Sequence, residues 1–224
     1  MGPEVRRPRV AVTRAAGQGD RLAERLEAIG CEPVVWPLIA IEALDGGPVD
    51  PGPYDWVVVT SPNGAAELAR RLTGKPRRLA AIGPGTAAAL RERGLEPALV
   101  PRESTQEGLL AELPTPAGYV LVAAAEGARR VIVDALAADF LPLYRTVELA
   151  PAEAPDVDIV LLASPSAARS LARTAARAVP VVVIGPQTAG AARELGLDVA
   201  AEADDHDLVG LLAALSRVLR DLPT

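Results

Sequence analysis

The chain has 224 residues, of which 50% are apolar and only 3% aromatic, and its formal net charge is −6. The arginines are scattered, so there is no basic stripe for a phosphate backbone, which argues against nucleic-acid binding. Pro, Gly, Arg or Asp interrupts every apolar run before roughly 18 residues, so no membrane-spanning helix is predicted. The single cysteine, Cys31, excludes an internal disulfide, and the absence of a signal-peptide pattern predicts a cytoplasmic protein.

Short apolar strands and helical segments alternate along the chain. Helical spacing of apolar residues predicts a helix over 19–29, which Gly30 ends. This alternation favours parallel sheets covered by helices. The apolar runs predict strands at 10–12, 34–36, 56–59, 79–82, 119–122, 159–162 and 181–184.

Two stretches of the sequence occur twice. Ala-Ile-Gly-Pro-Gly-Thr at 81–86 matches Val-Ile-Gly-Pro-Gln-Thr at 183–188, 102 positions later, and Ser61-Pro62 recurs 103 positions later at Ser164-Pro165. Residues 9–38 have a fainter counterpart in 119–144. A duplicated unit explains these matches, and it predicts two similar α/β domains.

The repeat permits two domain arrangements. The two domains could be consecutive in the chain. Alternatively, residues 1–37 and 150–224 form a discontinuous first domain, and residues 44–142 form a second domain inserted into it. In that arrangement, residues 38–43 and 143–149 form a two-stranded linker, since both stretches have the apolar alternation of extended chain.

The repeated motifs are turns between a strand and a helix. Ser61 or Asn63, and Ser164 or Ser166, are suitable helix N-caps. The Gly-Pro turns, 83–86 and 185–188, combine close backbone approach with a stiff helix start. Such turns lie at the carboxyl ends of parallel strands, where free amides suit carboxylates or phosphates. Two interpretations of these turns remain open. They can be ordinary helix caps, or the four of them can line a cleft between two domains and bind a polyanion.

Several kinds of site are disfavoured by the residues themselves. No Walker loop or dinucleotide fingerprint occurs, so no nucleotide cofactor is predicted. Asp204 to Asp207 is interpreted as a capping segment instead of a metal site, and no metal is predicted. His206, the only histidine, lies in that segment, which leaves nucleophilic catalysis without a base beside the Ser-Pro turns. Tyr144 is open to two interpretations, a packing residue or a proton donor.

The ordered set of motifs resembles the uroporphyrinogen-III synthase family. The matching elements are Val12-Thr13-Arg14, Thr60-Ser61-Pro62-Asn63-Gly64, Ile82-Gly83-Pro84-Gly85-Thr86, Ser104-Thr105, Leu143-Tyr144-Arg145-Thr146, Ser164-Pro165-Ser166 and Ile184-Gly185-Pro186-Gln187-Thr188. The resemblance implies two flavodoxin-like α/β domains, one inserted in the other and joined by a two-stranded linker. It also implies cofactor-free cyclisation of hydroxymethylbilane, with inversion of the last pyrrole ring and loss of water, to uroporphyrinogen III.

The resemblance also implies roles for single residues. Tyr144 matches the position proposed as proton donor. Two departures are visible: Ala123 to Ala125 lacks an arginine that the family often carries there, and Asp204 to Asp207 replaces the Ser-Thr pair of the first copy. The substrate-binding residues that it implies are Thr13, Arg14, Ser61, Pro62, Asn63, Gly83, Pro84, Gly85, Thr86, Ser104, Thr105, Ser164, Ser166, Gly185, Pro186, Gln187 and Thr188.

Two other functions compete with this one. A two-lobed protein that binds or senses a small molecule without chemistry would have the same layout, although such sensors usually carry a further domain. An enzyme of nucleotide or sugar metabolism would need catalytic carboxylates, and the best candidates, Glu67 and Glu107, lie in helical patterns. We expect a monomer with a small-molecule substrate and no nucleic-acid or membrane partner.

Overall fold

The computed structural model describes residues 6–221 and divides the chain into two compact units. The terminal unit contains the residues up to Ala40 and those from Val147 onward, and the central unit is Ile41–Thr146. Each unit is an α/β structure built on a five-stranded sheet. Residues 1–5 and 222–224 of the predicted first domain lie outside the described part.

The sheet of the terminal unit is entirely parallel. Its strands are β1 (Arg9–Val12), β2 (Glu32–Val35), β8 (Ile159–Leu162), β9 (Val181–Val183) and β10 (Val199–Glu202), in the order β10-β9-β8-β1-β2. In chain order this arrangement is 2-1-3-4-5, which is the flavodoxin-like order. The strand order reverses between β1 and β8, so their carboxyl ends form the switch point where such sheets bind ligands.

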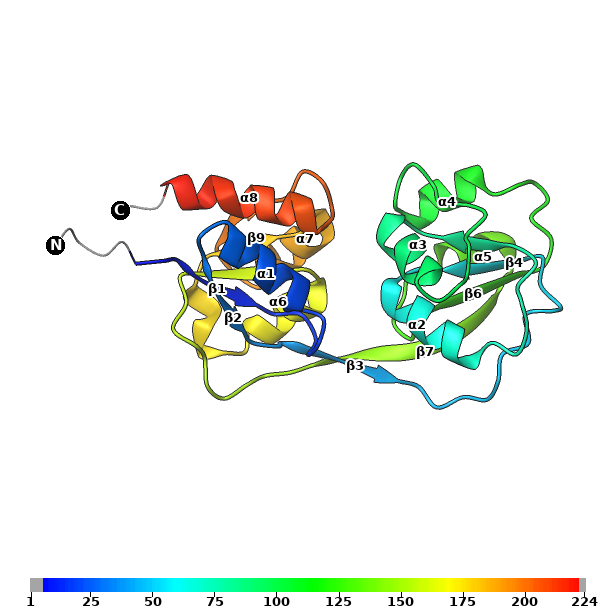
Figure 1. The fold of residues 1–224 in the computed structure, drawn as a ribbon, viewed down its shortest axis with the longest axis horizontal. Helices are drawn as coiled ribbons and strands as arrows, with labels where there is room; N and C mark the ends of the chain where they lie inside the picture. The colour runs from blue at the N-terminus through cyan, green and yellow to red at the C-terminus, as the bar shows by residue number, and fades with distance from the viewer. Residues whose placement is uncertain (1–5, 222–224) are drawn as a thin grey trace. The chain divides into compact units, whose positions relative to one another are not determined.

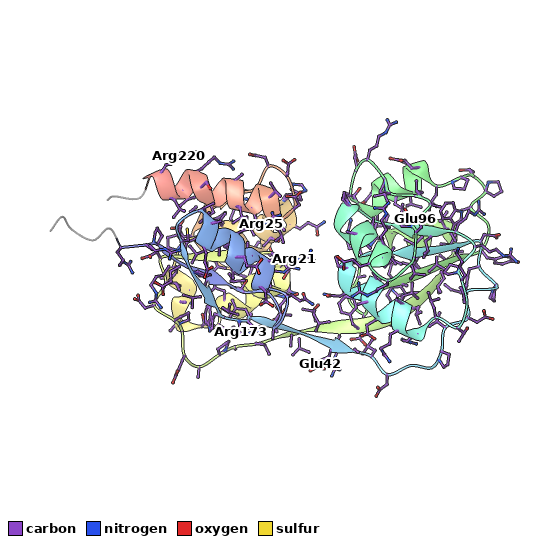
Figure 2. All side chains as sticks on the ribbon, in the orientation of Figure 1. Arg21, Arg25, Glu42, Glu96, Arg173 and Arg220 are labelled. Carbon is purple, nitrogen blue, oxygen red and sulfur yellow. The ribbon has the colours of Figure 1, made fainter. Side chains whose placement is uncertain are left out.

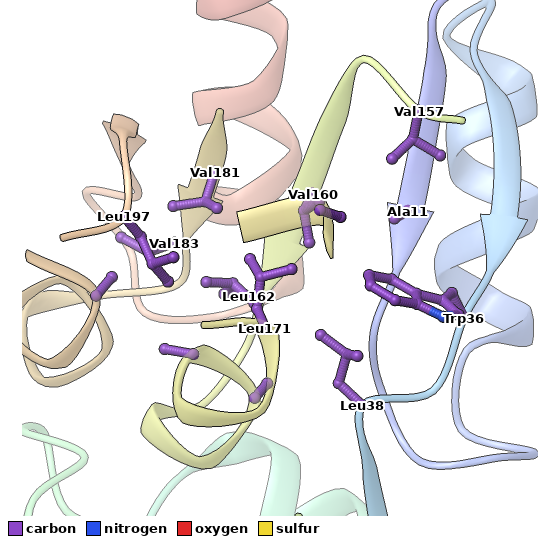
Figure 3. Close-up of a cluster of buried hydrophobic side chains, with 14 of the residues drawn as sticks. Ala11, Trp36, Leu38, Val157, Val160, Leu162, Leu171, Val181, Val183 and Leu197 are labelled. Carbon is purple, nitrogen blue, oxygen red and sulfur yellow. The ribbon is translucent and has the colours of Figure 1, made fainter. Parts of the chain in front are cut away.

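Helices cover both faces of this sheet (Figure 1). Helices α1 (Asp20–Ala28) and α8 (Leu208–Asp221) bury their apolar stripes on one face, against Val10 and Ile159. On the other face, α6 (Pro165–Leu171), the 3₁₀ helix η1 (Ala175–Ala178) and α7 (Pro186–Glu194) pack on a second cluster. Figure 3 shows Trp36, Leu38, Val160 and Leu171 in that cluster.

The central unit has the strand order β3-β7-β6-β4-β5. Its strands are β3 (Ile39–Ala43), β4 (Trp56–Val59), β5 (Leu79–Ala81), β6 (Val120–Ala125) and β7 (Asp139–Glu148). Helices α2 (Pro62–Arg71) and α3 (Pro84–Arg91) cover one face, and α4 (Gln106–Glu112) and α5 (Val131–Leu136) cover the other. A bridge from Ala80 to Leu99 places residues 98–100 where β10 lies in the terminal unit.

The two units therefore repeat one topology. Strand β6 lies beside β4 as β1 lies beside β8, and β7 follows β6 as β2 follows β1. Strand β3 is the addition, since it covers the outer edge of β7. Leu44 N donates to the Leu143 carbonyl and Leu149 N donates to the Leu38 carbonyl, so these two stretches of chain run antiparallel. The predicted fold class is confirmed.

Most predicted elements form, with shifted ends. The strand predicted at 34–36 starts at Glu32, the one at 119–122 extends to Ala125, and the strands predicted at 79–82 and 181–184 each end one residue early. The early ends have one cause, because Ile82 and Ile184 already lead into the Gly-Pro turns. Among residues 6–221, no helix meets the length and apolarity needed to cross a bilayer.

The Asp204–Asp207 segment caps α8, as predicted. The Asp207 Oδ1 accepts hydrogen bonds of 2.8 Å from Val209 N and Gly210 N. We expect Asp207→Ala to lower the free energy of unfolding by about 1 kcal/mol, because both amides lose their acceptor. Asp205→Ala is the matched control, and urea denaturation of both variants gives the measurement. Equal stabilities would show that water replaces the cap without cost.

Candidate active site

In the central unit, the Ser-Pro turn is bonded to Tyr144. Ser61 is the N-cap of α2, and its Oγ accepts from Gly64 N at 3.0 Å. The same Oγ lies 2.8 Å from the Tyr144 hydroxyl. Asn63, the alternative predicted cap, does not cap the helix but also hydrogen-bonds to Tyr144. The turn after β4 and the side chain from β7 thus form one polar group at the carboxyl end of the sheet.

Tyr144 is both packed and polar. Its side chain is 6% exposed and belongs to the cluster beneath α2 and α3. Burial raises the pKa of the phenol, and hydrogen bonds from Ser61 and Asn63 partly oppose that rise. The phenol therefore keeps its proton at neutral pH, which makes it a hydrogen-bond donor. Both interpretations of Tyr144 drawn from the sequence find support in its surroundings.

The Gly83 turn is closely packed against the segment before α4. A Cβ at Gly83 would lie 2.6 Å from the Ser104 Oγ, so a larger residue at position 83 would force the Ser104 side chain to move. Thr105 caps α4, with its Oγ1 accepting from Gly108 N at 2.9 Å. Pro84 and Gly85 are exposed at the start of α3, whereas Thr86 is buried. The groups available to a ligand are therefore the first backbone N–H groups of α3, which lack intrahelical acceptors.

The Ser-Pro turn of the terminal unit has the same geometry without a phenol. Ser164 is the N-cap of α6, and its Oγ accepts from Ala167 N at 3.2 Å. The Ser166 Oγ accepts from Arg169 at 3.0 Å, and Arg169 is in turn paired with Glu148. Ser164 is thus the cap, and the Ser166 hydroxyl belongs to an ion-pair network of the terminal unit.

The Gly185 turn mirrors the Gly83 turn. Here the neighbour is His206, whose Cδ2 would lie 2.8 Å from a Cβ at Gly185. Pro186 and Gln187 are exposed at the start of α7, while Thr188 is buried, as Thr86 is in the other unit. His206 therefore occupies the place of Ser104, a correspondence that the 102-residue repeat also gives. Among the described residues, no cluster of three or more His, Cys, Asp or Glu could hold a metal.

Thr13 and Arg14 follow β1 at the switch point of the terminal unit. The Thr13 side chain is buried, and its Oγ1 donates to the Leu161 carbonyl at 2.6 Å, which ties β1 to β8. Arg14 is partly buried, and desolvation lowers the pKa of its guanidinium. Because the ordinary pKa of an arginine side chain is very high, the guanidinium stays charged at neutral pH. A partly desolvated cation at a switch point is suited to bind an anion.

In the central unit, the arginines after β6 are engaged elsewhere. Arg129 makes two hydrogen bonds to the Glu107 carboxylate, at 2.7 and 3.1 Å, and the Arg130 guanidinium stacks 4.2 Å from the centre of the Phe140 ring. They do not replace the arginine that is missing from Ala123 to Ala125.

The sequence analysis did not identify Gln106, a buried polar residue at the start of α4. Its side chain contacts the Arg129 carbonyl, 23 residues away, and helical spacing carries no signal for such a contact.

Comparison with known proteins decides the family. The model of the family described as uroporphyrinogen-III synthase HemD matches residues 20–213, which is most of the chain. The chain belongs to the uroporphyrinogen-III synthase family. The match includes both Ser-Pro turns, both Gly-Pro turns and Tyr144. Of the motifs named from the sequence, only Val12-Thr13-Arg14 lies outside the matched residues.

Individual proteins that are similar to this chain also carry the name of this family. A uroporphyrinogen-III synthase of Synechococcus elongatus is 26% identical over 94% of this chain and 95% of its own length. A Methanocaldococcus jannaschii protein, provisionally assigned as a uroporphyrinogen-III synthase, is 31% identical, and the alignment spans 62% of each chain. The crystal structure of a mutant uroporphyrinogen III synthase from Thermus thermophilus shares the fold, with a TM-score of 0.60, 20% identity and coverage of 96% of this chain and 100% of that chain.

Proposed function

We propose that this protein cyclises hydroxymethylbilane to uroporphyrinogen III, with inversion of the terminal pyrrole ring and loss of water. The observation that carries the proposal is the hydrogen bond between Tyr144 and Ser61, within a chain that belongs to the uroporphyrinogen-III synthase family. It joins a protonated phenol to one of the repeated turns at the carboxyl end of a parallel sheet, where such sheets bind ligands.

Substrate binding is a problem of local charge. The linear tetrapyrrole carries eight carboxylates, and a protein with a net charge of −6 has no overall field to attract them. Arg14 supplies a cation in the terminal unit, and the first N–H groups of α3 and α7 supply hydrogen-bond donors in the two units. Each unit by itself therefore offers groups that can bind carboxylates.

The first chemical step is the departure of the substrate hydroxyl. In our proposal the Tyr144 phenol donates a proton to the hydroxyl oxygen, which leaves as water, so the pyrrole becomes an azafulvenium cation and the phenol becomes a phenolate. The last ring then attacks the methylene carbon of this cation through its substituted carbon and forms a spiro intermediate. The bond from that carbon to the neighbouring methylene breaks, the ring turns over, and the methylene bonds to the free α-carbon of the ring, whose proton returns to the Tyr144 phenolate. The Ser61 and Asn63 hydrogen bonds hold the phenol and support the negative charge that develops on its oxygen.

The remaining contribution of the protein is positional. The linear precursor closes without an enzyme to the symmetric isomer, so the protein must favour attack through the substituted carbon. Closely packed turns suit this role, since the side chains of Ser104 and His206 lie directly against the backbone of Gly83 and Gly185. No cofactor is required for any step of the proposed reaction, and we expect a monomer.

The proposal is tested by a coupled assay. Hydroxymethylbilane is generated with its own synthase, this protein is added, and the oxidised uroporphyrin isomers are separated by chromatography. We expect isomer III to predominate. Isomer I alone, formed at the uncatalysed rate, would contradict the proposal and would favour the alternative of a two-lobed binding or sensing protein without catalysis.

Replacing Arg14 should weaken substrate binding more than turnover. We expect Arg14→Gln to raise KM about tenfold, because a charge-assisted hydrogen bond contributes roughly 1.5–3 kcal/mol, while kcat changes little. Arg14→Lys should recover part of the loss, since it keeps the charge without the planar fork. Arg25→Gln is the control, because Arg25 projects from the exposed side of α1 (Figure 2). Equal KM values for the Arg14 and Arg25 variants would show that Arg14 does not bind the substrate.

A further inference from the structure

A buried amide at the start of α4 holds the loop that follows β6. Gln106 is 5% exposed; its Nε2 donates to the Arg129 carbonyl at 2.9 Å, and its Oε1 accepts from Ile132 N at 3.2 Å. Helix α5 has no other side-chain cap, because its N-cap residue, Arg130, makes no such bond. The Gln106 side chain thus caps α5 from another helix, and both its amide nitrogen and its amide oxygen have hydrogen-bond partners.

The same loop is held at its surface. Arg129 is paired with Glu107, the neighbour of Gln106 on α4, and these hydrogen bonds lower the pKa of the Glu107 carboxyl. Exposed ion pairs contribute little stability, so the two Gln106 hydrogen bonds, one buried and one partly buried, are the stronger restraint. The first turn of α4 and the loop of residues 126–130 are thereby joined.

This loop is bonded directly to the residue that carries the proposed proton donor. Glu126 N donates to the Tyr144 carbonyl at 2.8 Å. Ala125, the last residue of β6, is the register partner of Tyr144, just after an irregularity in the β6–β7 pairing. The regular ladder is interrupted there, and the bond from Glu126 N ties the Tyr144 backbone to the loop, while β3 pairs with the other edge of β7.

The equivalent position in the terminal unit carries no amide. Thr105 and Asp207 are equivalent caps in the repeat, 102 residues apart, so the equivalent of Gln106 is Leu208. A leucine offers no hydrogen bond to the loop after β1. Of the two equivalent positions, 106 and 208, only the one in the unit that contains Tyr144 therefore carries an amide.

We propose that Gln106 is a positioning residue for Tyr144, acting through the loop of residues 126–130. This inference deepens the proposed function and rests on it for its catalytic consequence. Loss of the Gln106 amide frees the loop, which lets the Tyr144 backbone move at the irregular register and shifts the phenol away from Ser61.

The test uses Gln106→Met, which keeps the size of the side chain and removes both hydrogen bonds. In the coupled assay we expect kcat to fall about tenfold, with KM within about twofold of the parent and a larger share of isomer I, because positioning acts on the reaction step. The control is Leu109→Ala, which opens a cavity in the core on the same helix without touching the amide.

A second readout reports on Tyr144 without depending on activity. The chain has three tyrosines, so Tyr54→Phe with Tyr119→Phe leaves Tyr144 as the only phenol. Alkaline titration of its phenolate absorbance should give a lower midpoint when Gln106→Met is added, because burial is the largest cause of the raised pKa of Tyr144, and its relief outweighs the loss of the Ser61 and Asn63 hydrogen bonds that lower this pKa. Leu109→Ala should leave the midpoint unchanged.

The outcomes separate the two proposals. An unchanged titration midpoint, or an unchanged kcat in a folded Gln106→Met protein, would overturn the role of Gln106. A kcat loss equal to that of Leu109→Ala would also overturn it, because the effect would then come from destabilised packing. A parent protein that forms only isomer I would reject the proposed function, while the titration would still show whether Gln106 positions Tyr144.

Discussion

Tyr144→Phe is expected to lower kcat about 100-fold while KM stays within about threefold of the parent. A positioned proton donor contributes roughly 10²–10⁴ to a rate, and the low end applies because a phenol is a weak acid. The ring of Tyr144 is buried in the cluster beneath α2 and α3, so phenylalanine keeps the packing and removes only the hydroxyl bonded to Ser61. Rates measured by isomer separation, under saturating and limiting substrate, distinguish the two constants.

Tyr54→Phe is the matched control for this change. Tyr54 lies in the same unit, and its hydroxyl donates to the Asp139 carboxylate at 2.8 Å, at the amino end of β7. It should leave both constants unchanged. If Tyr144→Phe also left turnover unchanged, Tyr144 would be a packing residue, which is the interpretation that the residues alone left open.

The raised pKa of Tyr144 predicts the sign of the pH dependence. Burial raises the pKa of the folded phenol above its unfolded value, so the protonated form is retained as pH rises through the ordinary tyrosine range. Its contribution to stability is complete below the unfolded pKa and is lost as pH rises through the folded one. If activity were lost in the pH range where an ordinary tyrosine titrates, burial would not raise the pKa of Tyr144 as we expect.

Gly210→Ala is expected to lower the free energy of unfolding by about 3 kcal/mol. A Cβ at Gly210 would overlap the backbone carbonyl of Asp205, which cannot yield as a flexible side chain can. Either α8 or the capping segment must move, and forced repacking of this kind costs roughly 1–3 kcal/mol, at the upper end where backbone is involved. Thermal unfolding should show a melting temperature lower by about 6–12 °C for a chain of this length.

Gly190→Ala is the matched control in the same unit. Gly190 lies within α7, and a Cβ there would meet nothing within 4 Å. Because glycine is a poor helix former, alanine at this position should raise the free energy of unfolding by roughly 0.5–1 kcal/mol. If both substitutions changed stability by the same amount in the same direction, the close approach of Gly210 to Asp205 would not be the cause.

Local patterns in the sequence determined much of this protein. The apolar runs placed the strands within a few residues, and the repeat of 102 to 103 residues predicted the two similar α/β units. Ser61 and Ser164 were among the predicted caps, because a hydroxyl residue before proline acts on amides two or three residues away. Such features depend on neighbours along the chain, so the chain itself reveals them.

Only the tertiary structure decided which polar groups meet. Ser61 and Tyr144 are 83 residues apart, and Gln106 meets Arg129 across 23 residues. The sequence placed Thr86 and Thr188 beside helix starts but gave no sign that both side chains are buried. Hydrophobic periodicity specifies which face of an element is buried, whereas register and helix packing specify which side chain lies opposite it. The contacts that hold Tyr144 arise from register and packing, so they had to be read from the folded chain.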